Sequence, residues 1–133
     1  MAADPTPLFA TLNVALGGAI GAAGRYQLGR AVSHLAGPNA IFPWPTLAAN
    51  VLGCLAMGAL VGWLAREGGS ESTRLLLGVG LLGGFTTFSA FGLEMLLLVE
   101  RGSPGLALGY AAISVAAGFA ALWLGLAAMR GIA

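Results

Sequence analysis

Four long apolar runs make up almost all of this 133-residue chain. A helix needs about 20 apolar residues to cross the hydrocarbon core of a bilayer. The runs lie at approximately residues 8–35, 44–65, 72–99 and 105–129, and short polar or Gly/Pro-containing connections separate them. They predict an all-α membrane protein of four transmembrane helices, embedded in a lipid bilayer as a single domain over residues 1–133.

Composition excludes several classes of protein. Only 8% of the residues are charged, whereas a soluble domain carries about 25%. The formal net charge of +1 gives no electrostatic basis for binding nucleic acid. No cluster of His, Cys and carboxylates has metal-site spacing, and no nucleophile–base set or phosphate loop is found. We therefore do not expect an enzyme.

The basic residues are nearly balanced between the two sides of the membrane. With four spans, Arg66, Arg74 and Arg130 fall on one side, and Arg30 and Arg101, with Arg25 near them, on the other. Orientation follows the excess of Lys and Arg in the cytoplasmic loops, and here the excess is almost nil. This balance favours insertion in both orientations and pairing of opposed copies. The alternative is a modest bias decided by a single loop charge.

The stretch from Gly83 to Phe91 interrupts the third run. Two glycines and two β-branched threonines weaken a helix there, and three hydroxyls and three phenylalanines follow at close spacing. Lipid offers no hydrogen bond to a freed backbone group, so this segment must face protein, water or an ion. The pattern predicts an element for ion binding or permeation.

Three polar residues inside the spans each have two or more interpretations. Arg25 is either a cation at an anion-attracting vestibule or a side chain that reaches the headgroups. Asn50 either lines an anion path with its amide donors or makes an interhelical hydrogen bond. Glu94 is a protonatable group, a partner for Arg25 or a hydrogen-bond anchor; a lone carboxylate beside an anion path must be protonated or paired.

Aromatic and hydroxyl side chains complete the candidate set. Phe88 and Phe91 share a helical face, and their electropositive ring edges could support a small anion. Ser89 adds a hydroxyl donor beside them. Tyr110 and Ser114 are four residues apart and therefore form one polar face of the fourth span. Small-residue pairs four apart predict close helix packing; they are Gly17 with Gly21, Gly58 with Gly62, Gly80 with Gly84, and Gly105 with Gly109.

Three segments of the chain resemble signatures of the Fluc (CrcB-like) fluoride channels. They are GGAIGAAGRY at residues 17–26, TLAANVLG at 46–53, and GGFTTFSAF at 83–91 with Glu94 after it. The third is the most specific, and the resemblance covers nearly the whole chain with the spans in the same order.

The resemblance implies an antiparallel, dual-topology homodimer with two fluoride pores, in the inner or plasma membrane, and a third helix broken at its centre. It implies a structural sodium ion held by backbone carbonyls, here those of Gly83 and Thr86. The aromatic box of the family corresponds to Phe88 and Phe91, and its second-helix asparagine to Asn50.

The remaining correspondences place the family's first-helix arginine at Arg25 and its fourth-helix polar track at Tyr110 and Ser114. Ala90 departs from the pattern, because the family commonly has threonine there, and one hydroxyl of the expected track is lost. The fluoride path expected for this chain comprises Phe88, Phe91, Asn50, Ser89, Tyr110 and Ser114, with Arg25 and Glu94 in vestibule or structural roles.

Two other classes of function stay open. A small dual-topology, proton-coupled multidrug exporter would need an accessible carboxylate in the membrane, and Glu94 is the one candidate. A non-conducting assembly subunit would pass no ion at all.

Overall fold

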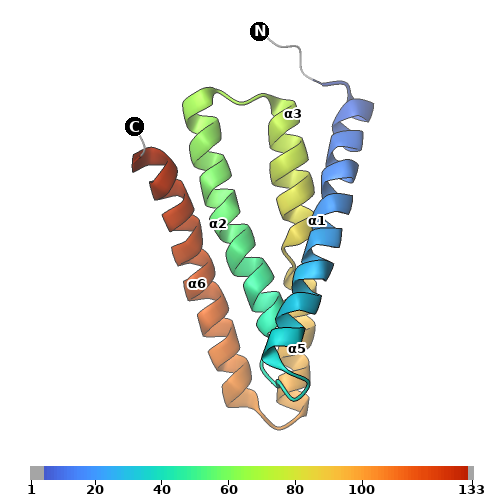
Figure 1. Ribbon diagram of the computed structural model, residues 1–133, viewed down its shortest axis with the longest axis vertical. Helices are drawn as coiled ribbons and strands as arrows, with labels where there is room; N and C mark the ends of the chain where they lie inside the picture. The colour runs from blue at the N-terminus through green and yellow to red at the C-terminus, as the bar shows by residue number, and fades with distance from the viewer. Residues whose placement is uncertain (1–4, 132–133) are drawn as a thin grey trace.

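The computed structural model describes residues 5–131 and is helical almost throughout (Figure 1). Three of its spans are single helices: α1 (Pro7–Ala36), α2 (Trp44–Glu67) and α6 (Pro104–Gly131). The other span consists of α3 (Glu71–Thr73), the π-helix η1 (Arg74–Leu82), α4 (Gly83–Phe85) and α5 (Phe88–Glu100). All four spans are long and apolar enough to cross a membrane, which confirms the prediction of an all-helical protein with four such spans.

Local sequence signals set the ends of the helices. The side chain of Thr6 accepts a hydrogen bond from the backbone N–H of Phe9, and Pro7 occupies the first turn of α1, where a missing N–H costs little. Gly68 follows the last residue of α2, and its φ of 65° is a left-handed conformation that favours glycine. The spans alternate in direction, and the start of α1 and the end of α6 lie at the same end of the molecule as the α2–α3 connection (Figure 1).

Glycines bring the helices into backbone contact in two places. A Cβ on Gly21 of α1 would overlap the carbonyl of Leu81 in η1, and one on Gly58 of α2 would overlap the carbonyl of Leu122 in α6. In both places the absence of a side chain allows one backbone to pack on another, as predicted. Gly105 and Gly109 differ from that prediction, because a Cβ on either would meet no atom within 4 Å.

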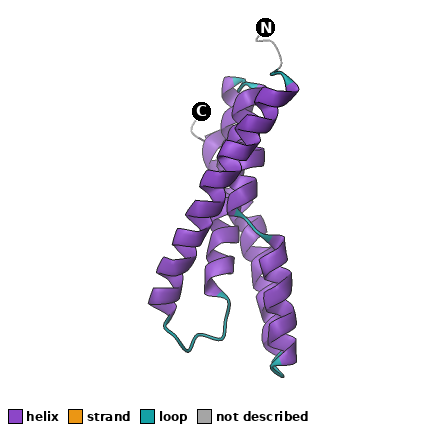
Figure 2. Ribbon diagram, turned by 90° about the vertical axis from the view of Figure 1, so that its right-hand side faces the viewer, coloured by secondary structure: helices purple, strands orange, loops and turns teal. Residues whose placement is uncertain are grey.

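The buried core of one chain is small. Leu98, Ala107 and Tyr110 form a buried cluster between α5 and α6, and Tyr110 is completely buried. Many large apolar side chains elsewhere face outward; Phe88, for example, is 83% exposed and Phe119 74%. α1 also diverges from α5 toward the end of the molecule that carries the α1–α2 loop (Figure 2). One chain therefore leaves broad apolar faces for lipid or for another subunit.

Candidate functional site

The backbone leaves the helical conformation at two consecutive residues in the middle of the third span. Thr86 has φ −82° and ψ 160°, and Thr87 has φ −151° and ψ 126°, so both are extended. α4 ends before them and α5 begins after them, as the loop-coloured segment in Figure 2 shows. The hydroxyl of Thr87 caps α5 by accepting from the backbone N–H of Ala90 at 3.3 Å.

Asn50 of α2 pairs with this extended segment. Its Nδ2 donates to the carbonyl oxygen of Thr87 at 3.0 Å, and its Oδ1 accepts from the Thr87 N–H at 2.8 Å. One side chain thus satisfies both backbone groups that the helix has released, in surroundings where lipid satisfies neither. Of the two interpretations of Asn50, the interhelical hydrogen bond is the one observed, and Nδ2 has a second N–H for a further acceptor.

Glu94 lies at the centre of a hydrogen-bond network that joins three spans. Thr46 of α2 donates its hydroxyl to Oε1 at 2.6 Å, and Tyr110 of α6 donates its hydroxyl to Oε2 at 2.8 Å. Both donors are buried, with Thr46 7% exposed and Tyr110 0%. Of the three interpretations of Glu94, this geometry matches the hydrogen-bond anchor.

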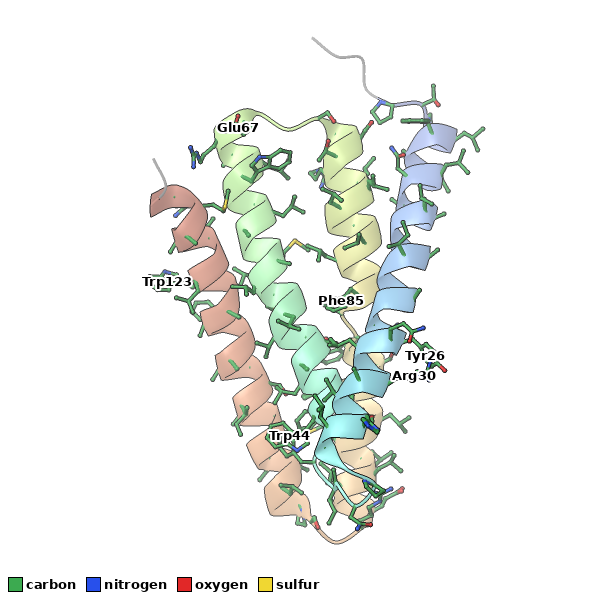
Figure 3. The ribbon with its side chains drawn as sticks, in the orientation of Figure 1. Tyr26, Arg30, Trp44, Glu67, Phe85 and Trp123 are labelled. Atoms are coloured by element: carbon green, nitrogen blue, oxygen red, sulfur yellow. The ribbon has the colours of Figure 1, made fainter. Side chains whose placement is uncertain are left out.

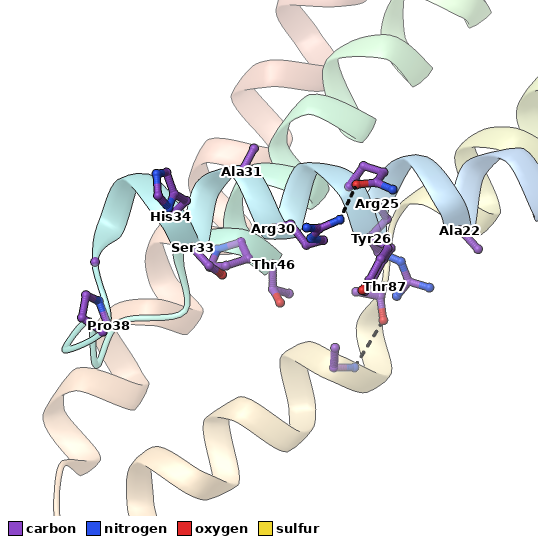
Figure 4. Close-up of a pocket in the computed structure, with 15 residues that line it drawn as sticks. Ala22, Arg25, Tyr26, Arg30, Ala31, Ser33, His34, Pro38, Thr46 and Thr87 are labelled. Carbon is purple, nitrogen blue, oxygen red and sulfur yellow. Dashed lines mark hydrogen bonds between the residues drawn. The ribbon is translucent and has the colours of Figure 1, made fainter.

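Arg25 does not pair with Glu94. The ion pair found in residues 5–131 joins Arg74 to Glu71, at the other end of the third span. Arg25 instead lines a groove of about 1210 Å³, together with Arg30, His34 and the exposed side of the extended segment at Thr87 (Figure 4). The guanidinium carbon of Arg30 lies 6.0 Å from the ring centroid of Tyr26, and both side chains project from the outer side of α1 (Figure 3).

The aromatic side chains of α5 continue inward to Tyr110. The ring centroids of Phe88 and Phe91 are 5.7 Å apart, and those of Phe91 and Tyr110 are 5.0 Å apart. Phe88 is exposed at one end of this run, while Tyr110 is buried at the other. The three rings therefore lead from the surface of the chain to the Glu94 network.

The two serines differ in their surroundings. Ser89 is exposed, and its hydroxyl lies 3.4 Å from that of Thr87. Ser114 lies one turn beyond Tyr110 on α6, and its buried hydroxyl has no hydrogen-bond partner among the described residues. A buried hydroxyl without a partner is costly, so it calls for an explanation.

The expected sodium ligands are the backbone carbonyls of Gly83, the first residue of α4, and of Thr86, the residue that follows α4. The residues described contain no group of three or more His, Cys, Asp or Glu that could hold a metal ion. The carbonyl oxygens of the expected site are hard ligands, the kind that a sodium ion prefers.

Sequence reasoning missed two residues of the site. Thr46 was not selected, although it lies four residues before Asn50 and hence on the same face of α2. Phe42 lies in the connection between α1 and α2, and its ring packs edge-on against Tyr110 with a centroid distance of 5.4 Å. No periodicity applies to a loop residue, so the sequence held no signal for this contact.

Comparison with known proteins gives a consistent result. Residues 12–126 match the family model described as CrcB-like protein, Camphor Resistance (CrcB). A curated relative from Novosphingobium aromaticivorans is 64% identical over 124 residues, which cover 93% of this chain and 98% of the relative. Relatives from Erythrobacter litoralis and Sphingopyxis alaskensis are 54% and 49% identical; the alignments cover 93% and 88% of this chain and 94% and 92% of the relatives.

All three relatives bear the name "Fluoride-specific ion channel FluC". These are names of ion channels and not of enzymes, in agreement with the expectation that this chain is not an enzyme. The matched region includes every residue of the candidate site, from Arg25 to Ser114. By this match and by its four apolar helices, the chain is a multi-pass membrane protein that belongs to the CrcB-like family of ion channels.

Proposed function

We propose that the protein is a fluoride-selective channel through which fluoride leaves the cell passively, across the inner or plasma membrane. The observation that carries this proposal is the end-to-end similarity to relatives named as fluoride-specific channels, at up to 64% identity. The geometry supports this proposal, because aromatic rings and hydroxyl groups gather at one site in a chain that is otherwise largely apolar.

A fluoride channel must replace the water around a small anion. An unpaired ion in a low-dielectric medium costs on the order of tens of kcal/mol, so donors must line the path. In our proposal the donors are Asn50, Ser89 and Ser114, whereas Tyr110, whose one hydroxyl proton goes to Glu94, lines the path with its ring. The ion accepts from the second N–H of the Asn50 amide and from the unpartnered hydroxyl of Ser114. These donors are neutral, so they hold the ion without trapping it.

The ring edges of Phe88 and Phe91 carry the ion between the polar positions. An aromatic ring is electropositive at its edge, and the inclined arrangement of these two rings, with an interplanar angle of 35°, allows both to present edges to one path. A narrow path of this kind disfavours chloride, which is larger.

The channel would be an antiparallel homodimer with two pores. Phe88 is 83% exposed in a single chain, which therefore cannot enclose the path by itself. The nearly equal numbers of arginines on the two sides allow copies of opposite orientation to meet. In the dimer, the second copy would cover Phe88, and Arg25 in its groove would attract anions toward the path.

A structural sodium ion would lie between the two copies. One chain offers two backbone carbonyls for it, those of Gly83 and Thr86, and two oxygens are too few for a hard cation. The carbonyls of Gly83 and Thr86 in the second copy would double the number of oxygen ligands. The ligand set therefore fits a sodium ion only at a two-fold axis between the copies. Bound there, the ion supplies positive charge that offsets the carbonyl dipoles.

The test is fluoride efflux from liposomes that contain the purified protein, followed with a fluoride electrode. We expect rapid fluoride efflux and far slower chloride efflux. Chloride permeability equal to that of fluoride would refute the selectivity, and no efflux would indicate an assembly subunit.

Proton-coupled drug export is disfavoured because both oxygens of Glu94 already accept hydrogen bonds. Glu94→Gln would abolish such export but need not stop passive fluoride efflux.

A further inference from the structure

The second and fourth spans, α2 and α6, run in the same direction and meet in a constant register (Figure 1). In each facing pair the two residue numbers differ by 64. The facing pairs are Thr46 with Tyr110, which share the carboxylate of Glu94, Cys54 with Gly118, and Gly58 with Leu122. The same register places Asn50 opposite Ser114, one helical turn beyond the Glu94 network.

Cys54 lies one turn further along the same face of α2. It is four residues after Asn50 and is partly buried. Gly118, opposite, has no side chain, and a Cβ built on it would lie 3.4 Å from the sulfur of Cys54. The thiol therefore fills the space beside Gly118. We call the side chains at these three levels the polar series; its members are Thr46, Tyr110, Asn50, Ser114 and Cys54.

A buried cysteine often serves only as a small packing residue, but the neighbours of Cys54 indicate more. The buried hydroxyl of Ser114 has no hydrogen-bond partner among the described residues, and Ser114 lies one turn before Gly118 on the face of α6 that meets Cys54. The amide of Asn50 has a second N–H beyond the one that it donates to Thr87. These two donors next to the thiol call for a hydrogen-bond acceptor at this level.

Beyond Cys54 the two helices close on each other. A Cβ on Gly58 would overlap the carbonyl of Leu122, and one on Gly125 would overlap the carbonyl of Leu55. Backbone packs directly on backbone there, which leaves no room for an ion between α2 and α6. The polar series therefore ends at Cys54, and an ion that follows the series must leave the space between these helices at that level.

We infer that Cys54 lines the fluoride path as the last donor of the polar series and sets how easily the ion leaves it. This inference rests on the proposed fluoride flux. A channel must bind its ion weakly enough for the ion to depart. A thiol donates a weaker hydrogen bond than a hydroxyl or an amide, so the ion passes from the stronger donors Asn50 and Ser114 to a weaker one before it leaves.

The thiol can be tested directly, because Cys54 is the one cysteine of the chain. Methyl methanethiosulfonate is small and uncharged; its CH3S group bonds to the sulfur, which loses its proton, and methanesulfinate leaves. In liposomes that contain the purified protein, we expect this modification to lower fluoride efflux at least tenfold. Cys54→Ala should be unaffected by the reagent. Full efflux from the modified protein would remove Cys54 from the path.

Protection by the ion separates a path residue from a packing residue. Mass spectrometry follows how fast the reagent modifies Cys54. Excess fluoride should slow this modification several-fold, because the ion occupies the position beside the thiol. The same concentration of chloride should have no effect, because chloride is excluded from the narrow path. A loss of efflux on modification without protection by fluoride would show that Cys54 only packs against Gly118.

Substitutions test the same role without a reagent. Cys54→Ser supplies a stronger donor of similar size, so we expect it to lower the half-saturating fluoride concentration and to slow maximal efflux a few-fold. Cys54→Val removes the donor and should slow efflux about tenfold. The matched control is Ala48→Val, because Ala48 lies two residues from Asn50, on the opposite side of α2, where it lines an apolar groove. Its efflux should equal that of the wild type.

The two proposals fail in different ways. If the wild type passes fluoride and Cys54→Ser matches it in both flux parameters, the assignment of Cys54 is wrong and the channel stands; equal efflux from folded Cys54→Val and Ala48→Val would lead to the same conclusion. If the wild type passes no fluoride, the proposed function fails, and the assignment of Cys54 with it.

Discussion

A single side chain, Asn50, satisfies both backbone groups of Thr87 in the middle of the third span. Replacing it with alanine leaves a partly buried donor and acceptor unpaired, and each such group costs about 1–3 kcal/mol. We predict that Asn50→Ala lowers the midpoint of thermal unfolding in detergent by several degrees and abolishes fluoride efflux. The matched control is Asn13→Ala on α1, whose side chain makes no hydrogen bond within residues 5–131. Similar losses of stability in both variants would contradict the prediction.

At Ser114 we expect a substitution to change stability and fluoride efflux in opposite directions. Its buried hydroxyl has no partner among the residues described, so its removal should relieve a desolvation cost. We predict that Ser114→Ala raises the free energy of unfolding by up to about 1 kcal/mol and slows fluoride efflux at least tenfold. Ser114→Thr retains the hydroxyl and should retain flux. Denaturant unfolding and efflux measured on the same preparations provide the check, and a less stable Ser114→Ala would show that the hydroxyl has a structural partner.

At the scale of helices, the apolar runs were enough to predict four helical spans, because lipid leaves few alternatives to a helix. The hydrogen bonds between different spans could not be predicted from the sequence. The contact between Asn50 and Thr87 joins residues 37 apart, and no periodicity within one helix encodes it. The resemblance to a family identified candidate residues, but it did not predict that Thr46 and Tyr110 would share one carboxylate.

The glycine pairs illustrate the same limit, since identical spacing leads to different packing. Gly21 has no room for a methyl group beside Leu81, whereas Gly109 has open space. We predict that Gly21→Ala lowers the unfolding midpoint strongly or prevents folding. Gly109→Ala should leave the stability of a single chain unchanged or raise it by up to about 1 kcal/mol, because alanine favours a helix over glycine. Thermal unfolding at two protein concentrations is the measurement. A concentration-dependent loss in Gly109→Ala would instead place that glycine in contact with a second copy.

At the scale of the whole molecule, the numbers of arginines on the two sides of the membrane are nearly equal. One or two added charges should therefore decide the orientation in which the chain inserts. Glu67→Arg with Gly131→Arg adds two arginines to the side of Arg66, and Asn39→Arg adds one to the side of Arg30. We predict that the wild type inserts in both orientations, so that reporters of either compartment fused to its C-terminus are both active. Each variant should instead insert in one orientation, and the two variants in opposite ones.

The fluoride efflux of these variants then tests whether opposed copies are required. A chain confined to one orientation has no inverted partner to cover Phe88, which is 83% exposed in isolation. Each variant expressed alone should therefore lose fluoride efflux from cells while it still reaches the membrane. Expressing both variants together should restore efflux, because each supplies the orientation that the other lacks. Full efflux from a single-orientation variant would mean that copies pointing the same way, or one chain alone, can form the path, and the antiparallel dimer would then have to be abandoned.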